Sequence, residues 1–189
     1  SMEEIAAPYA MTTSSNLSSS RALRDVTEQY GGEYFAAAVG EVNVTTKMKE
    51  CDCLIGGEGN GGVIYPALHY GRDAMVGVAL FLTNLAYKKM KVSELRASYP
   101  EYVIAKNKIE LSDKGLIDRI LDKVKEVYAA EDINTIDGVK ISFESRKEWV
   151  HLRRSNTEPI IRIYAEAATK EAADALAQQI IDIANSIIQ

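Results

Sequence analysis

The sequence is poor in the residues that most often mark metal, redox or disulfide sites. Its 189 residues include two cysteines and two histidines. Cys51 and Cys53 are separated by one residue and have no histidine nearby, because His69 and His151 lie elsewhere. In a strand the two thiols would point to the same face, too constrained for an ordinary disulfide. We therefore interpret them as buried structural thiols in a reducing compartment.

Long apolar runs and net positive charge are also missing. We find no signal peptide and no stretch long enough to span a membrane, so we expect a cytoplasmic protein without a membrane partner. Lysine and arginine number 22 against 27 aspartates and glutamates, a formal net charge of -5. An acidic chain is a poor candidate for non-specific nucleic-acid binding, and we expect no nucleic-acid partner. Ser1-Met2 is typical of residues left by cloning and is excluded from the fold.

The first part of the chain alternates helix and strand after a weakly patterned opening through Asn16. "SRALRDVTEQY" and "NVTTKMKE" predict helices, and "EYFAAAV" and "CDCLIGG" predict buried strands. This alternation favours a parallel α/β sheet. A mostly apolar helix follows, roughly from Asp73 to Met90, and a helix apolar on most sides should be buried. "SELRASYPEY" predicts a short helix broken at Pro100, where we place a domain boundary.

The rest of the chain has a different rhythm. "YVIAKNKIEL" predicts a strand and "SDKGLIDRILDKVKEVYA" an amphipathic helix. Asp137-Gly138 lies between two apolar runs and predicts a hairpin. The strands "EWVHLR" and "IIRIYAEA" and a final helix from about Lys170 complete it. We therefore predict an α/β domain over 3–98 and a small α+β domain over 99–189, with helices on one face of an antiparallel sheet.

The loop "GGEGNGG", from Gly56 to Gly62, follows a predicted strand and precedes the helical region. It matches neither a Walker A loop nor Gly-x-Gly-x-x-Gly in register with a βαβ unit. The carboxylate of Glu58 can accept two hydrogen bonds from neighbouring hydroxyls, as on a sugar ring, and Asn60 can both donate and accept. A solvated turn is the alternative interpretation of this loop.

A second loop lies within "RRSNTEPIIRIYAEA", which begins at Arg153. Arg153 can offer a planar fork of donors to a phosphate, and Ser155, Asn156 and Thr157 add hydroxyls and a tight turn. The alternative is a hairpin loop with solvated arginines. Arg162 lies in the following strand and needs a partner if it is buried or functional. We interpret Arg154 and His151 as solvated or structural, and strand alternation turns Arg154, the next residue, away from Arg153.

Together, "RRSNTEPIIRIYAEA" and "GGEGNGG" resemble the phosphate-binding loop and the sugar-specificity loop of the α-D-phosphohexomutases. "NLSSSRAL", "AVGEVNV" and "YGRDAMVGVALFL" resemble the flanking segments, and phosphoglucomutase/phosphomannomutase is the nearest subgroup. The resemblance implies that sugar hydroxyls are held by the first loop, and the non-reacting phosphate by the second. The sugar-binding residues would be Gly57, Glu58, Gly59, Asn60 and Gly61, and the phosphate-binding residues Arg153, Ser155, Asn156 and Thr157.

The resemblance also implies a reaction and its partners. Enzymes of this family have four domains around one cleft and transfer a phosphoryl group between O1 and O6 of a hexose, through a phosphoserine and a bisphosphate. The expected ligands are a hexose 1-phosphate or 6-phosphate and the hexose 1,6-bisphosphate. Glu41 follows Val39-Gly40 where some relatives carry a histidine that touches the substrate, and Asn60 stands where serine is more usual.

The sequence lacks the stretches that carry the family's chemistry. No Thr-Ala-Ser-His-Asn-Pro stretch is present for the phosphoserine, and no Asp-Gly-Asp-x-Asp-Arg stretch for Mg²⁺. Phosphoserine and Mg²⁺ are therefore expected in a full-length parent, and no catalytic or metal-binding residue is expected here. The chain resembles the C-terminal part of such an enzyme, with a third domain incomplete at its start and contacts to missing N-terminal domains. Alone, it should be inactive.

Three other interpretations stay open. The chain could be a stand-alone, non-catalytic module that binds sugar phosphates. It could also come from a parent of the phosphoglucosamine mutase type, because glucose, mannose and glucosamine phosphates are not separated by these motifs. In a third interpretation the loops are inert turns, and the long apolar helix from Asp73 is a surface for a protein partner.

Overall fold

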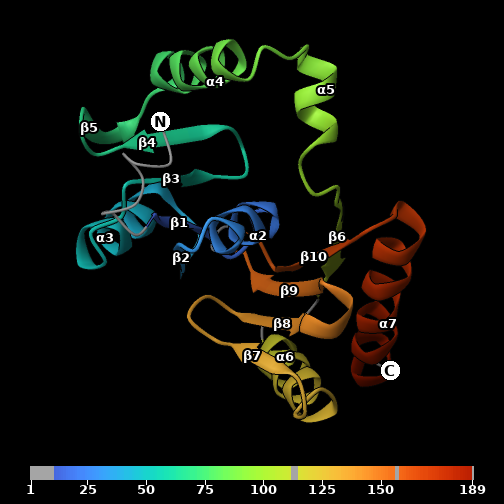
Figure 1. The fold of residues 1–189 in the computed structure, drawn as a ribbon. Helices are drawn as coiled ribbons and strands as arrows, with labels where there is room; N and C mark the ends of the chain where they lie inside the picture. The colour runs from blue at the N-terminus through green and yellow to red at the C-terminus, as the bar shows by residue number, and fades with distance from the viewer. Residues whose placement is uncertain (1–10, 112–114, 156–157, 189) are drawn as a thin grey trace. The chain divides into compact units, whose positions relative to one another are not determined.

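The computed structural model describes residues 11–111, 115–155 and 158–188. The chain divides into two units, Ser1–Glu101 and Tyr102–Gln189, and each unit contains its own five-stranded sheet (Figure 1). The predicted fold class is confirmed, since an α/β unit is followed by an α+β unit with an antiparallel sheet. No helix in the described part of the chain is both long and apolar enough to cross a membrane.

The first unit begins with alternating strands and helices and ends with two helices in succession. In chain order its elements are β1 (Thr12–Asn16), α2 (Ala22–Gln29), β2 (Glu33–Ala37), α3 (Glu41–Glu50), β3 (Ile55–Glu58), β4 (Gly62–Tyr65), β5 (His69–Arg72), α4 (Ala74–Lys88) and α5 (Val92–Ala97).

The first sheet is only partly parallel. Its strand order is β2-β1-β3-β4-β5. Strands β2 and β3 run parallel to β1, whereas β4 pairs antiparallel with β3, and β5 antiparallel with β4. The prediction of a parallel sheet is therefore wrong for its last two strands. The physical reason is the glycine loop, which is short enough to return the chain at once as a hairpin.

Strand β1 lies inside the sheet although it is entirely polar. It reads Thr-Thr-Ser-Ser-Asn, and Thr13, Ser14, Ser15 and Asn16 are all buried. The hydroxyl of Thr13 lies 2.8 Å from that of Thr27, and the hydroxyl of Ser15 lies 2.9 Å from that of Tyr34. Side-chain hydrogen bonds thus replace apolar packing along this strand. The sequence pattern did not predict β1, because it contains no apolar residue to count.

The sequence predicted the two cysteines to lie in a strand, and this prediction is wrong. Cys51 caps the end of α3, and Cys53 lies in the turn before β3. Both thiols are free, Cys53 is buried and Cys51 is half-buried. Burial raises the pKa of the Cys53 thiol to about 11, so it stays protonated near neutral pH. Cys53 packs with Val44 and Met48 of α3 in the core of the unit, which is a structural role.

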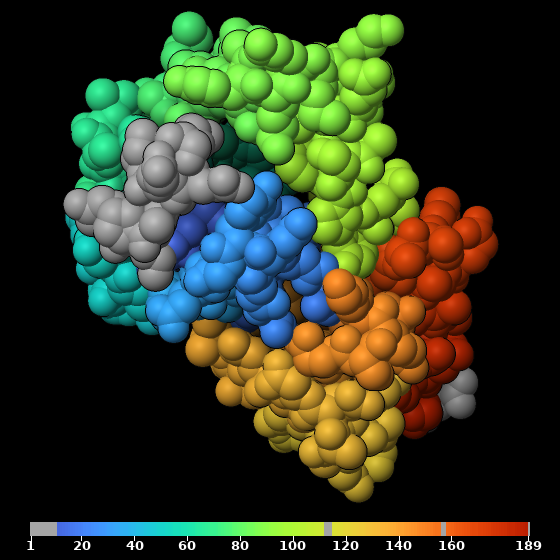
Figure 2. Space-filling model, viewed as in Figure 1, coloured from blue at the N-terminus to red at the C-terminus, as the bar shows by residue number. Residues whose placement is uncertain are grey.

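Helix α4 begins where it was predicted, and Asp73 accepts a hydrogen bond from the backbone N–H of Val76 as its N-cap. The expectation that this helix is buried is wrong. None of its residues is buried, and Met75, Val78 and Leu82 are each more than half exposed. Figure 2 shows the green side chains of α4 on the outside of this unit.

The second unit contains an antiparallel sheet with strand order β6-β10-β9-β8-β7. Its elements are β6 (Val103–Glu110), α6 (Gly115–Val127), β7 (Asp132–Asn134), β8 (Val139–Phe143), a 3₁₀ turn η1 (Glu144–Arg146), β9 (Glu148–Arg154), β10 (Ile160–Ala167) and α7 (Lys170–Ile188). The predicted hairpin is confirmed: Gly138, between β7 and β8, has a φ of 76°.

Both helices of this unit cover the same face of its sheet. Alternate residues of β8, β9 and β10 form one core cluster with residues of α6 and α7, as predicted from the amphipathic pattern. The members from the three strands are Val139, Ile141, Phe143, Val150, Leu152, Ile161, Ile163 and Ala165. The other residues of β9 and β10 face the opposite side, where Trp149 donates a hydrogen bond of 2.7 Å from Nε1 to Glu166 Oε1. Arg153 and Arg162 belong to this second face.

Candidate functional site

The glycine loop of the first unit is the tip of a β-hairpin. Gly56, Gly57 and Glu58 end β3, and Gly62 begins β4. The expectation that this loop leads from a strand into a helix is wrong, because β4 and β5 intervene before α4. Gly61 has a φ of 94°, a conformation that favours glycine. A Cβ on Gly57 would lie 2.1 Å from the carbonyl oxygen of Gly62, so only glycine fits where the two strands meet.

Glu58 projects from the end of β3 and is half-buried. Its Oε1 accepts a hydrogen bond of 2.8 Å from Nδ2 of Asn16, at the end of β1. Among the described residues, its Oε2 has no hydrogen-bond partner. Glu58 therefore has one oxygen held by the protein and one available to an incoming donor.

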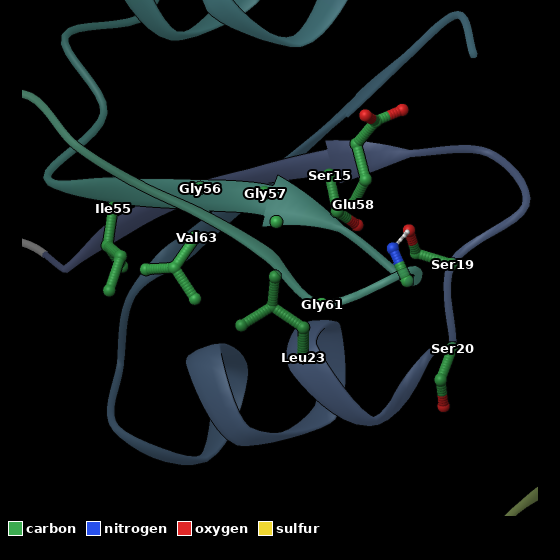
Figure 3. A pocket seen from close by; sticks show the side chains of 12 residues that line it. Ser15, Ser19, Ser20, Leu23, Ile55, Gly56, Gly57, Glu58, Gly61 and Val63 are labelled. Carbon is green, nitrogen blue, oxygen red and sulfur yellow. Dashed lines mark hydrogen bonds between the residues drawn. The ribbon is translucent and has the colours of Figure 1, made fainter. Parts of the chain in front are cut away.

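The next residue of the hairpin is held from the same segment. The backbone N–H of Gly59 donates to the hydroxyl of Ser19 at 2.8 Å, the bond drawn in Figure 3. Ser19 is buried, and its own hydroxyl donates to Oδ1 of Asn16 at 3.0 Å. Sequence reasoning missed Asn16 and Ser19. The segment "NLSSSRAL" contains both residues and resembles a flanking segment of the family, but nothing in its sequence indicates a contact with the hairpin.

Asn60 lies at the tip, and its side-chain oxygen accepts from the backbone N–H of Gly62 at 3.2 Å. This bond fixes the amide orientation and leaves the Asn60 NH₂ group as a donor. A hollow of about 560 Å³ beside the tip is lined by Asn60, Glu41 and Arg72, among others. Glu41 is bound there by Arg72: Nε lies 2.7 Å from its Oε2, and the Arg72 backbone N–H donates to its Oε1 at 3.2 Å. The structure thus brings Glu41 and Asn60 to one hollow.

A second hollow, of about 290 Å³, lies under the hairpin. Figure 3 shows Leu23, Ile55 and Val63 pointing into the space beneath β3, while the Glu58 carboxylate projects to the other side of the strand. Its wall is therefore apolar, and the polar groups of the hairpin are gathered at the edge. The carboxylate and the Asn60 amide, rather than this hollow, are the groups suited to a polar ligand.

The phosphate-loop prediction falls at the end of β9. Arg153 Nε lies 2.8 Å from Asp137 Oδ2, although Nε makes no aligned hydrogen bond with any described residue. The hydroxyl of Ser155 accepts from the backbone N–H of Glu158 at 3.4 Å. Asn156 and Thr157, which were also assigned to the phosphate, lie outside the described residues. Arg154 forms an ion pair with Asp118, so its interpretation as a solvated or structural residue stands.

Arg162 lies directly opposite Arg153 in the register of β9 and β10. On its other side it lies opposite Lys108 of β6. Glu158 Oε2 is 3.8 Å from Arg162 NH2, a long ion pair, and the Arg162 side chain is 43% exposed. Like charges that face each other across antiparallel strands are unfavourable, so this row is suited to an added anion.

His151 is a buried structural residue next to this row. Its Nε2 lies 2.6 Å from the carbonyl oxygen of Asp137, and the side chain is 1% exposed. Desolvation by burial lowers the pKa of His151 to about 4, which outweighs the opposing effect of the hydrogen bond to Asp137. A neutral imidazole therefore anchors the hairpin turn that carries the partner of Arg153.

This depressed pKa predicts that acid destabilises the second unit. An unfolded histidine titrates near 6.5, so the unfolded state binds more protons between pH 6.5 and 4. The contribution of neutral His151 to the free energy of unfolding is fully present above pH 6.5. It is lost as the pH falls to about 4, a change of about 3 kcal/mol. Urea unfolding followed by the fluorescence of Trp149, the single tryptophan, measures it. His151→Gln should flatten this pH dependence, and the control His69→Gln, at an exposed histidine of the first unit, should not.

No group of three or more histidine, cysteine, aspartate or glutamate side chains that could hold a metal ion occurs within residues 11–111, 115–155 and 158–188.

Two descriptions of one family match the chain. Residues 3–102 match "Phosphoglucomutase/phosphomannomutase, alpha/beta/alpha domain III", and residues 106–183 match the C-terminal domain of the same family. The chain therefore belongs to the phosphoglucomutase/phosphomannomutase family and contains its third and C-terminal domains.

Individual relatives agree with this assignment. The chain is 33% identical over 177 residues to a probable phosphoglucosamine mutase of Methanopyrus kandleri, covering 92% of this chain and 38% of the relative. It is 35% identical over 166 residues to a phosphoglucosamine/phosphogalactosamine mutase of Sulfurisphaera tokodaii, covering 87% of this chain and 36% of that one. The chain thus spans well under half of either relative.

A solved structure shows the same fold. A phosphoglucomutase/phosphomannomutase family protein of Burkholderia thailandensis matches with a TM-score of 0.76 at 24% identity. The match covers 96% of this chain and 39% of the Burkholderia chain.

Proposed function

We propose that this chain is the sugar- and phosphate-binding C-terminal portion of a phosphohexomutase. The whole enzyme would transfer a phosphoryl group between O1 and O6 of a hexose through a bisphosphate. The serine that carries the phosphoryl group and any Mg²⁺ would belong to other domains. In this proposal 3–98 is the third domain and 99–189 is the fourth, and both would contact the other domains of the whole enzyme.

The observation that carries the phosphate part is the pair of arginines across β9 and β10. Arg153 and Arg162 face each other beside Ser155, at the start of the Ser-Asn-Thr loop. A phosphate dianion between them would relieve their repulsion and accept charge-assisted hydrogen bonds. Asp137 pairs with Arg153 at Nε, and no described residue forms an ion pair with the terminal amino groups of the guanidinium, which could therefore bind the phosphate. Asn156 and Thr157 are assigned to the same phosphate.

The sugar part of the proposal rests on the hairpin. Glu58 offers an oxygen without a partner among the described residues, and Asn60 offers an NH₂ group. Together they provide an acceptor and a donor for adjacent hydroxyls of a sugar ring. Gly57, Gly59 and Gly61 allow the backbone turn that places them there. Glu41 is a further candidate, because it lines the same hollow as Asn60.

A hexosamine phosphate is a second candidate substrate. The relatives from Methanopyrus and Sulfurisphaera carry phosphoglucosamine mutase names, whereas the matched family is described by phosphoglucomutase and phosphomannomutase. Glu41 and Glu58 could accept from an ammonium group as well as from a hydroxyl.

A titration of the labelled chain followed by NMR tests the proposal. Glucose 1-phosphate, mannose 1-phosphate and glucosamine 1-phosphate should shift amides of both the Glu58 hairpin and the β9–β10 loop. Inorganic phosphate should shift only the second. Sugar phosphates that shift no amide resonance of the hairpin would contradict the sugar assignment. A parent gene that encodes no serine loop would instead indicate a stand-alone binding module.

The isolated chain should show no mutase activity. Conversion of glucose 1-phosphate to glucose 6-phosphate, measured with a coupled dehydrogenase assay, should stay at the level of the buffer blank, because the chain provides no phosphoserine. Adding the rest of the parent enzyme as a separate chain is the positive control. Turnover by the isolated chain would contradict the division of labour proposed above.

A further inference from the structure

Asn16 is the last residue of β1 and is almost fully buried, at 5% exposure. Its side-chain amide takes part in three hydrogen bonds. Oδ1 accepts from the backbone N–H of Ser18 and from the hydroxyl of Ser19, each at 3.0 Å, and Nδ2 donates to Glu58 Oε1 at 2.8 Å. The Ser18 N–H can only donate and the Glu58 carboxylate can only accept, so each of these two partners fits one side of the amide.

The direction of these bonds is fixed by two backbone N–H groups. A backbone N–H can only donate, so the bond from Ser18 requires the oxygen of the Asn16 amide on that side. The NH₂ group must then face Glu58. In the same way, the Gly59 N–H donates to the Ser19 hydroxyl, which directs the Ser19 hydrogen toward Asn16.

We propose that Asn16 is the positioning residue that keeps Glu58 an acceptor for the sugar, an inference that rests on the proposed function. Ser19 would hold the adjacent Gly59 in place. Because Nδ2 donates to Oε1, Glu58 is held by a donor and presents Oε2 as a second acceptor. The hairpin therefore selects ligands with a donor, a hydroxyl or an ammonium group, at the position facing Glu58. A sugar phosphate with an ether or a hydrogen at that position gains nothing there.

Substitution of Asn16 by aspartate changes the hydrogen-bonding character of the side chain without changing its shape. The variant Asn16→Asp keeps the side-chain size and the oxygen that accepts from Ser18 and Ser19. It replaces only the donor toward Glu58, where two carboxylates would then face each other. A matched control lies two residues earlier: Ser14 is equally buried in β1, and its hydroxyl has no hydrogen-bond partner among the described residues.

The first arm of the test needs no ligand. Amide hydrogen exchange of Gly59 should be at least tenfold faster in Ser19→Ala than in the unaltered chain, and unchanged in Ser14→Ala. An unchanged Gly59 exchange rate in Ser19→Ala overturns the connection from β1 to the hairpin, whatever the chain binds. Dispersed amide spectra of each variant establish that it is folded.

The second arm measures dissociation constants for glucose 1-phosphate and inorganic phosphate by NMR titration. Asn16→Asp should weaken the affinity for glucose 1-phosphate at least tenfold and change the affinity for inorganic phosphate less than twofold. Ser14→Ala should change the affinity for either ligand less than twofold. If Asn16→Asp weakens the binding of both ligands equally, or of neither, the inference is overturned. If the unaltered chain does not bind glucose 1-phosphate through the hairpin, the proposed sugar function fails and takes the inference with it.

The double variant Asn16→Asp/Glu58→Gln distinguishes positioning from simple bracing. The NH₂ group of glutamine can donate to the new carboxylate, and its amide oxygen then stands in the place of Oε2 as an acceptor for the sugar. Glucose 1-phosphate binding should therefore be tighter in the double variant than in Asn16→Asp. Binding that stays as weak as in the single variant would overturn the proposal.

Discussion

Replacement of Arg153 by alanine should weaken the binding of inorganic phosphate and of glucose 1-phosphate by about 10- to 100-fold. A hydrogen bond to a charged group contributes roughly 1.5–3 kcal/mol, and one factor of ten in affinity corresponds to about 1.4 kcal/mol. Isothermal titration or NMR line positions measure the effect. The loss should be similar for both ligands, since both would meet Arg153 through a phosphate group.

Arg154→Ala is the matched control for this experiment. Arg154 is the next residue of β9, carries the same charge, and pairs with Asp118. Strand alternation turns it away from Arg153, so its removal should change either affinity less than twofold. Equal effects of the two substitutions would mean that the loop attracts anions by overall charge alone, and the assignment of a specific phosphate site to Arg153 would fail.

Gly57→Ala should have the largest effect on folding of any single methyl added to the hairpin. Its Cβ would lie 2.1 Å from the Gly62 carbonyl oxygen, an overlap that forces β3 and β4 apart. We expect a loss of about 3 kcal/mol in the free energy of unfolding of the first unit. Gly61→Ala adds the same methyl where nothing lies within 4 Å and strains only the backbone, at about 1 kcal/mol.

Urea unfolding followed by circular dichroism compares these two variants. Trp149 lies in the second unit, so its fluorescence should report an unchanged transition in both. If Gly57→Ala proved as mild as Gly61→Ala, the close approach of the two strands would not be what requires glycine there. The prediction would then be wrong, and Gly57 would be free to serve the ligand directly.

The sequence predicted the second unit well because its pattern is regular. Alternating apolar residues in β8, β9 and β10 and the stripe on α6 define one core face without ambiguity. The first unit was harder to predict. Strand β1 stabilises itself with hydroxyl and amide hydrogen bonds rather than apolar contacts, and α4 is apolar without being buried. Both depart from the relation between hydropathy and burial on which pattern reading depends.

The candidate site also contains residues that the sequence pattern predicts and residues that it does not. Glu58, Asn60 and Arg153 were predicted because their chemistry and motifs stand out locally. Asn16 and Ser19 were missed because their partners are about forty positions away in the sequence. A hydrogen bond between segments that distant depends on the register of β1 against β3, which no local pattern contains.

The polar composition of β1 has a consequence for how sugar preference can change. This strand is enclosed by β2 and β3, so the groups that orient Glu58 belong to a part of the sheet with little freedom to adjust. The ordering cost of the acceptor is thus met when the chain folds rather than when a ligand arrives. If the hairpin binds a sugar as proposed, a substitution that shifts β1, such as one at the Thr13–Thr27 contact, should change the sugar preference although neither residue contacts the ligand.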